Sequence, residues 1–193
     1  MKSGKNKAAL KFHSLTPSRW PDLVTLFGAR GACGGCWCMA WRLPHSQWAQ
    51  QKGTRNRNAL RKITKTGPPP GVLAYAGKQP IGWCALAPRE QYVALGRSRV
   101  LAPLDAQPVW SVSCFFVERS FRKRGVSVAL LKAAVAFAKK RGAKIVEGYP
   151  FDYRAAKSPD VFVWTGLPGT FLKAGFSVAA RRSPTRPILR RVV

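Results

Sequence analysis

The sequence predicts a single mixed α/β (α+β) domain spanning residues 1–193, and three features support this prediction. The chain has 193 residues, of which 46% are hydrophobic, enough to bury one sizeable core. Residues 109–117 (VWSVSCFFV) are largely apolar on both faces, as expected of a central strand that is covered on both sides. Residues 125–140 carry apolar side chains at three- and four-residue spacing, which indicates an amphipathic helix.

The first part of the chain is expected to alternate strand and helix. Residues 8–15 can form a first strand, and the apolar spacing of residues 17–27 indicates a helix. The Gly-rich, aromatic stretch 28–44 is expected to be a loop, followed by one polar helix over 46–65. The Gly-Pro-Pro-Pro-Gly segment 67–71 ends that helix, because proline removes a donor and cannot continue helical geometry.

The second part begins with a predicted β-hairpin of strands 72–76 and 80–87. The proline-containing residues 88–108 are expected to form an irregular loop. Simple alternation in the strand 109–117 predicts one face with Trp110, Val112, Cys114 and Phe116, and the other with Val109, Ser111, Ser113, Phe115 and Val117. The remaining expected elements are a strand at 144–150, a short helix at 168–174, and strands at 176–182 and 187–192.

The charge balance is strongly basic, with 34 Lys and Arg against 7 Asp and Glu, a formal net charge of +27. Such a field attracts phosphate-bearing ligands and gives weak, salt-dependent, non-specific binding to nucleic acid, but it selects neither a fold nor a reaction. The basic residues are spread from Lys2 to Arg191, which is typical of a solvated surface.

No apolar run approaches the roughly 20 residues that span a bilayer, and the basic start lacks the features of a secretory signal. We therefore expect a cytoplasmic protein with no membrane contact. Its five cysteines show no disulfide framework and are interpreted as reduced thiols. The cluster of Cys33, Cys36 and Cys38 is compatible with zinc, with a reactive thiol or with packed loop thiols; zinc would need a fourth ligand such as His45, and we predict no metal.

A candidate anion site lies between the central strand and the helix that follows it. The segment Arg122–Ser127 (RKRGVS) leads directly into the helix, where the first backbone N–H groups have no internal partner and the helix dipole is positive. Gly125 allows the backbone to approach a ligand closely. The turn before the helix therefore predicts an anion site that can hold a pyrophosphate.

With Arg122, Gly125 and Ser127, this turn resembles the pattern Arg/Gln-x-x-Gly-x-Gly/Ala of the GNAT superfamily of acyl-CoA-dependent N-acetyltransferases, Ser127 being a departure from it. The order of elements extends the resemblance over residues 8–192. It implies a mixed, mostly antiparallel sheet with helices on both faces, splayed after the strand 109–117 into a V-shaped cleft for acetyl-CoA.

The resemblance also implies the residues that bind this cosubstrate. The main chain of the strand end would bind the pantetheine arm, and the turn would bind the pyrophosphate. The expected cofactor-binding residues are Phe115, Phe116 and Val117 for the former, and Arg122, Lys123, Arg124, Gly125, Val126 and Ser127 for the latter.

The implied activity is transfer of the acetyl group of acetyl-CoA to a primary amine by direct attack in a ternary complex, by a monomer or homodimer. Removal of the amine proton needs a base or a water relay, and Glu118 and Glu147 are the preferred bases. The other candidates are Glu90, Asp152, His13 and His45.

Many family members have a catalytic tyrosine where this chain has Phe171, which has no proton to give. The acid must then be water or another group, and Tyr149, Tyr153 and Thr170 are the candidates. Trp37 and Trp41 are expected to line the acceptor pocket.

The sequence is also compatible with two alternative functions. One is a basic nucleic-acid-binding module, which would need exposed aromatic side chains interleaved with basic ones. The other is an acyl-CoA sensor without catalysis, suggested by Phe171.

Overall fold

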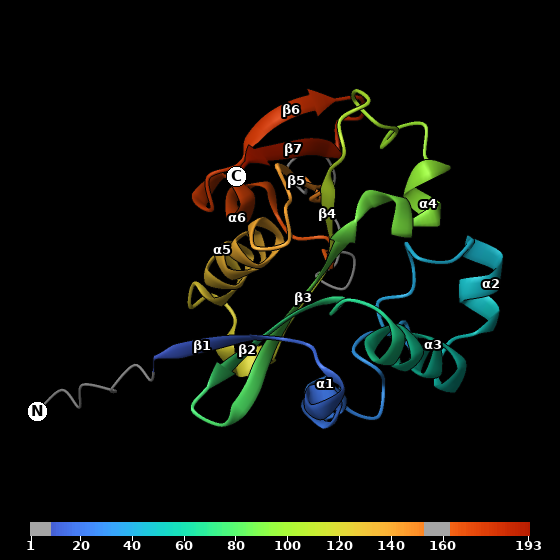
Figure 1. Ribbon diagram of the computed structural model, residues 1–193, viewed down its shortest axis with the longest axis vertical. Coiled ribbons are helices and arrows are strands. Elements are labelled where there is room, and N and C mark those ends of the chain that lie inside the picture. Colours follow the sequence, from blue (N-terminus) through green and yellow to red (C-terminus); the bar gives the residue numbers. More distant parts are fainter. Residues whose placement is uncertain (1–8, 153–162) are drawn as a thin grey trace, which may run out of the picture.

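The structure is a computed structural model that describes residues 9–152 and 163–193. The strands form one seven-stranded sheet in the order β1-β2-β3-β4-β5-β7-β6 (Figure 1). All neighbouring strands are antiparallel except β4 and β5, which run parallel, so the mixed, mostly antiparallel sheet is confirmed. The strands are β1 (Leu10–Ser14), β2 (Gly71–Ala76), β3 (Gln79–Pro88), β4 (Trp110–Val117), β5 (Ile145–Gly148), β6 (Ser177–Arg181) and β7 (Pro187–Val192).

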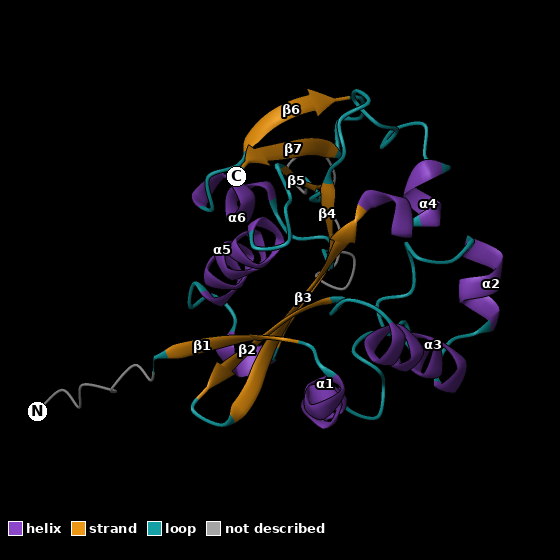
Figure 2. Cartoon of the chain, viewed as in Figure 1, coloured by secondary structure: helices purple, strands orange, loops and turns teal. Residues whose placement is uncertain are grey.

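Helices cover both faces of the sheet, as Figure 2 shows. One face carries α5 (Val126–Lys139) and α6 (Pro168–Lys173). The other carries α1 (Trp20–Phe27), α2 (His45–Gln50), α3 (Thr54–Thr66) and α4 (Val93–Gly96). Short 3-10 turns are η1 (Pro17–Arg19), η2 (Arg89–Gln91) and η3 (Arg119–Phe121). In the described part of the chain, no helix is long and apolar enough to cross a membrane.

Helix α5 confirms the most regular pattern in the sequence. Its buried stripe, which includes Leu130, Ala134 and Ala138, packs on the sheet against residues such as Ile81 and Val112. A second core on the opposite face joins α1 and α3 to β2 and β3. The sheet is therefore buried on both sides, which explains why the central strands are apolar at nearly every position.

Two predictions about the long connections are wrong. The polar segment 46–65 forms two helices, because Gly53, with φ 84°, has a left-handed conformation that interrupts the helix between α2 and α3. The segment 88–108 contains η2 and α4, whose Tyr92 and Leu95 are buried. Burial of these side chains gives the segment local order that its prolines did not indicate.

The predicted alternation of side chains in β4 is also wrong for the residues that follow Val112. Ala85 pairs with Cys114 but the next residue of β3, Leu86, pairs with Val112, so Ser113 is the extra residue of a β-bulge. The bulge exchanges the faces of the side chains that follow it. Consequently the group Val112, Phe115 and Val117 faces α5, whereas Cys114 and Phe116 pack with the α1 side.

Strands β4 and β5 separate shortly after they meet. Their register contains three pairs and ends with Val112 opposite Gly148. Within the described residues, the rest of β4, from Ser113 to Val117, has no partner strand on that side. This separation is the expected V-shaped opening in the sheet.

An aromatic side chain of α6 lies at the vertex of this opening. Phe171 is fully buried, and its ring packs edge-on against Phe115 with centroids 5.8 Å apart. A Cβ atom on Gly148 would lie 1.9 Å from Phe171 Cε1, far closer than atoms can approach. Glycine is therefore required in β5 because the ring occupies the space where a side chain would go.

We expect Gly148→Ala to lower the free energy of unfolding by about 3 kcal/mol, because the new methyl group must displace Phe171 from a packed core. Gly169→Ala is the matched control, since a Cβ atom there meets nothing within 4 Å. The control should be neutral or slightly stabilising in α6. Urea denaturation of both variants measures the difference, and equal stabilities would contradict this account of the vertex.

Candidate functional site

The turn before α5 has the geometry of an anion-binding site. Gly125 adopts φ 79° and ψ 1°, a left-handed conformation, and Lys123 also has a positive φ of 59°. No side chain caps the start of α5, and its first turn contains no acidic residue. The first N–H groups of this 14-residue helix therefore face outward with the positive end of the helix dipole behind them.

A groove of about 490 Å³ opens in front of this turn. It runs between the beginnings of α5 and α6 and reaches β6, and Lys123, Lys173 and Arg181 supply its positive charge. The acid Asp152 also lines it and forms an ion pair with Arg181 at 3.1 Å. Basic side chains thus outnumber the acid at this groove, which favours a phosphate-bearing ligand.

Only some residues of the predicted turn line the groove, and the others make contacts elsewhere. Lys123, Gly125 and Ser127 line the groove. Arg122 instead donates through Nε to the carbonyl oxygen of Val117 at 3.0 Å and thereby fixes the end of β4. Two others act on packing: Val126 is buried in the core, and the Arg124 guanidinium lies over the Phe121 ring.

The open edge of β4 presents main-chain groups from alternate residues. The N–H of Glu118 donates to the carbonyl of Ile81 in β3, so the antiparallel alternation directs the main chain of Phe116 toward β3 as well. The main-chain N–H and C=O groups of Phe115 and Val117 therefore face the opening. The N–H of Phe115 donates to the carbonyl of Trp164 at 2.7 Å, in the connection before α6.

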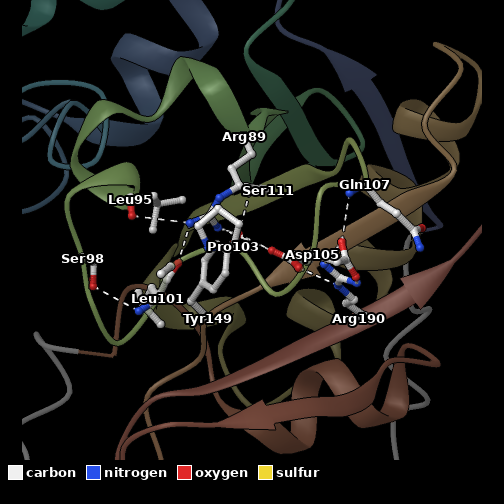
Figure 3. A network of polar contacts seen from close by, with 12 residues as sticks. Arg89, Leu95, Ser98, Leu101, Pro103, Asp105, Gln107, Ser111, Tyr149 and Arg190 are labelled. Atoms are coloured by element: carbon white, nitrogen blue, oxygen red, sulfur yellow. Dashed lines mark hydrogen bonds and ion pairs between the residues drawn. The ribbon is translucent and has the colours of Figure 1, made fainter.

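Tyr149 belongs to a polar network with Ser111, Arg89 and Arg190 (Figure 3). Glu147 is bonded to Tyr149, and both side chains are buried. Tyr149 donates its hydroxyl hydrogen to Glu147 Oε2 at 2.7 Å and lies 2.8 Å from Ser111 Oγ. Arg89 Nη1 donates to the Tyr149 oxygen at 2.6 Å, and Arg190 Nε donates to Glu147 Oε1 at 2.6 Å. The charge of Glu147 is thus balanced by two arginines, at 3.5 Å from Arg89 and 2.6 Å from Arg190.

The environment also controls the protonation of this tyrosine. Burial raises the pKa of Tyr149 well above its ordinary value, and the negative charge of Glu147 raises it further. The hydroxyl therefore remains protonated at neutral pH. A protonated hydroxyl bonded to a carboxylate can accept a proton while it passes its own to the carboxylate.

The other predicted site residues lie elsewhere. Glu118 caps η3, accepting hydrogen bonds from the backbone N–H and the hydroxyl of Ser120. Trp37 is 4% exposed and stacks on Trp20 in the core, whereas the ring of Trp41 packs on Trp164. Of the remaining candidate acids, Thr170 lines the groove beside α5, and Tyr153 lies outside the described residues.

The three clustered cysteines differ in burial. Cys33 is exposed, Cys36 is half-buried and Cys38 is buried, with its sulfur 3.3 Å from the sulfur of Cys114 in β4. The hydrogen bond from Cys38, together with burial, raises the pKa of the Cys114 thiol. In the described part of the chain, no three His, Cys, Asp or Glu side chains form a group that could hold a metal ion.

Sequence reasoning did not find the partners of Glu147. Arg89 lies 58 residues before it and Arg190 lies 43 residues after it. No local motif connects such positions, because the sheet register brings them together. The only available signal was the scarcity of acids, since each buried carboxylate in so basic a chain has many arginines to attract.

We expect Glu147→Gln to lower the free energy of unfolding by about 3 kcal/mol, because it leaves Arg89 facing a buried neutral group and removes one of the two carboxylates that pair with Arg190. Glu118→Gln, which alters a partly exposed cap, should cost about 1 kcal/mol or less. Chemical denaturation of both variants measures the contrast. A smaller loss for Glu147→Gln than for Glu118→Gln would show that the buried network does not stabilise the fold.

The family model described as the acetyltransferase (GNAT) family matches residues 37–155, which include the Gly125 turn and the vertex. No curated protein matches the sequence.

Solved structures share the fold at low sequence identity. A GNAT-family acetyltransferase from Streptococcus agalactiae is 13% identical with a TM-score of 0.58, covering 95% of each chain. A GCN5-related N-acetyltransferase from Kribbella flavida is 18% identical with a TM-score of 0.53, covering 96% of this chain and 98% of its own. The PaiA N-acetyltransferase of Thermoplasma acidophilum, solved with coenzyme A, is 13% identical with a TM-score of 0.52, covering 96% and 99%.

Proposed function

Because the chain belongs to the GNAT family of acetyltransferases, we propose that it transfers the acetyl group of acetyl-CoA to a primary amine by direct attack in a ternary complex. The observation that carries this proposal is the left-handed Gly125 turn, which opens the uncapped start of α5 onto a basic groove. The adjoining edge of β4 is free of a partner strand within the described residues.

The residues present fit the cosubstrate. The N–H groups at the start of α5, behind Gly125 and Ser127, would hold the pyrophosphate, and Lys123, Lys173 and Arg181 supply positive charge. The main chain of Phe115 and Val117 would bind the pantetheine amides. The N–H of Phe115 would then exchange its bond to the Trp164 carbonyl for one to the cosubstrate.

The chemistry follows from the bonds that change. The amine nitrogen attacks the thioester carbonyl, the new C–N bond forms, the C–S bond breaks and CoA leaves as a thiolate. An unperturbed lysine-like amine has a pKa of about 10.4, so it must lose a proton to attack. A thiol with a pKa of about 8.5 is a good leaving group and needs only weak assistance.

We assign the proton transfers to Tyr149 and Glu147 because they lie next to the last pair of β4 and β5. Tyr149 would take the amine proton as it passes its own to Glu147, and would later return a proton to the thiolate. Glu118, at the far end of β4 and bonded to Ser120, is the second choice for the base. Of the two tryptophans expected to line the acceptor pocket, Trp41 is the better candidate because it packs beside Trp164, whereas Trp37 lies in the core.

The nucleic-acid alternative lacks the surface it would need. Phe115 is buried, and Trp110 and Phe116 are half-buried. In the described ranges the exposed large hydrophobic residues are Val93, Leu172, Val178 and Val192, none of them aromatic. Base stacking on exposed rings is therefore not supported, and the net charge of +27 accounts only for weak, salt-dependent attraction.

The experiment that tests the function has two steps. Acetyl-CoA and longer acyl-CoAs are first compared by thermal shift with NAD and ATP, and acetyl-CoA should stabilise most. Release of free CoA thiol is then measured over an amine library. Binding of acetyl-CoA without release in the presence of any amine would favour the non-catalytic sensor.

We expect Gly125→Asp to abolish measurable acetyl-CoA binding. A side chain and a negative charge would lie where the backbone meets the pyrophosphate, and two unit charges about 4 Å apart repel by about 4 kcal/mol at an effective dielectric of 20. Arg124→Ala, which removes a charge lying over Phe121, should weaken the binding of acetyl-CoA by about 1 kcal/mol or less. Calorimetric titration after circular dichroism tests both, and unchanged affinity in folded Gly125→Asp would remove the cosubstrate from this turn.

We expect Tyr149→Phe to lower kcat by about 100-fold while the Kd for acetyl-CoA stays within about 2-fold, because the hydroxyl handles protons and does not face the phosphate groove. Single-turnover thiol release and calorimetry separate the two quantities. Ser183→Ala, a hydroxyl loss in the loop between β6 and β7, is the control. An unchanged kcat in Tyr149→Phe would exclude this residue from the chemistry.

A further inference from the structure

One buried arginine has no negatively charged partner among the described residues. Arg42, at the end of the Gly-rich stretch, is 8% exposed. Its Nη1 donates to the neutral Gln91 Oε1 at 3.1 Å, and its guanidinium lies 4.7 Å from the centre of the Tyr92 ring. Its Nη2 is buried without any hydrogen-bond partner there. A buried cation in this state is costly unless an anion joins it.

Arg89, on the same side of the sheet, shows that a buried arginine in this fold can have a carboxylate partner. Arg89 is similarly buried and pairs with Glu147, and the other ion pairs of the described residues involve Arg181 and Arg190. Arg42 has no carboxylate within 4.0 Å in that part of the chain. Its charge is therefore left for a partner that is not part of the described fold.

Three further polar groups in this region also lack a hydrogen-bond partner. The Trp41 Nε1, the Tyr92 hydroxyl and the Ser113 hydroxyl are each buried without a partner in the described residues. Burial raises the pKa of Tyr92, so its hydroxyl keeps its hydrogen. All of these groups are hydrogen-bond donors, and the Ser113 hydroxyl lies close enough to the Tyr92 hydroxyl to lower its pKa.

The position of these donors links them to the cleft. Ser113 is the bulge residue of β4, next to the last pair with β5. Trp41 packs on Trp164, whose carbonyl holds the N–H of Phe115. The donors thus border the vertex, and Tyr92 and Trp41 belong to the core cluster on the face opposite α5, away from the phosphate groove.

We propose that Arg42, with Trp41, Tyr92 and Ser113, binds a carboxylate of the acceptor, so that the acceptor is an amine that also carries a carboxylate, such as a free amino acid. This inference rests on the proposed function. One guanidinium balances one carboxylate, whereas a phosphate dianion would exceed the charge available. A zwitterionic acceptor also avoids the repulsion that a polycationic amine would meet on a chain of net charge +27.

The test compares acceptors that differ only in this group. Thiol release is measured with amino acids of apolar, polar and basic character, each beside its carboxamide and its decarboxylated amine; phenylalanine, phenylalaninamide and phenethylamine form one such set. The expected kcat/KM is at least 100-fold higher for the amino acid than for its two analogues in at least one set. This comparison uses the unaltered protein and does not depend on the folding of any variant.

Variants then locate the preference. Arg42→Gln should lower kcat/KM for the preferred amino acid by about 100-fold and leave its carboxamide within about 3-fold, with Arg42→Lys intermediate. Arg61→Gln, an exposed arginine of α3, is the matched control and should change neither. Circular dichroism and the Kd for acetyl-CoA, expected to be unchanged, show that folding and the phosphate site are intact.

The outcomes separate this inference from the proposed function. Equal turnover of amino acids and carboxamides would overturn the carboxylate site and leave acetyl transfer standing. If no amine is acetylated although acetyl-CoA binds, thermal shift with N-acetylphenylalanine and N-acetylphenylalaninamide decides the inference alone. Stabilisation by the acid only, lost in Arg42→Gln, would support the carboxylate site without catalysis; equal responses would overturn it.

Discussion

The fold of this protein depends on one steric constraint, the placement of the Phe171 ring where β4 and β5 separate. The ring takes the space of a side chain at Gly148 and packs edge-on against Phe115 and Phe176. A strand pair held apart by a rigid, buried ring cannot continue its ladder, so the second half of β4 keeps an open edge.

The same position explains a chemical departure. A phenylalanine at residue 171 supplies packing and no proton, so proton transfer must be handled by other groups. The hydroxyl of Tyr149 is held nearby by Glu147, Ser111 and Arg89. In the proposed mechanism the proton transfers belong to Tyr149 and Glu147, so Phe171, where the strands separate, can be fully apolar.

Positive charge serves different purposes at different depths. Lys123, Lys173 and Arg181 give the groove a field that favours phosphates. Deeper, Arg89 pairs with Glu147 and Arg190 pairs with Glu147 and Asp105, whereas Arg42 is buried against Gln91 and Tyr92 without an acid among the described residues. Desolvation makes the deep charges specific, because a buried cation that lacks a partner discriminates strongly in favour of an anion.

The sequence by itself determined the features that local interactions control: the hairpin, the helix over 126–139 and the turn at Gly125, whose left-handed conformation glycine adopts without strain. Tertiary structure alone decided the bulge at Ser113, which depends on the register with β3, and the burial of Trp37 in the core. It also brought Arg89 and Arg190 to Glu147 and left Arg42 without an acid in the described chain. These contacts join residues tens of positions apart, and only the packing of the sheet and its helices sets the distances between them.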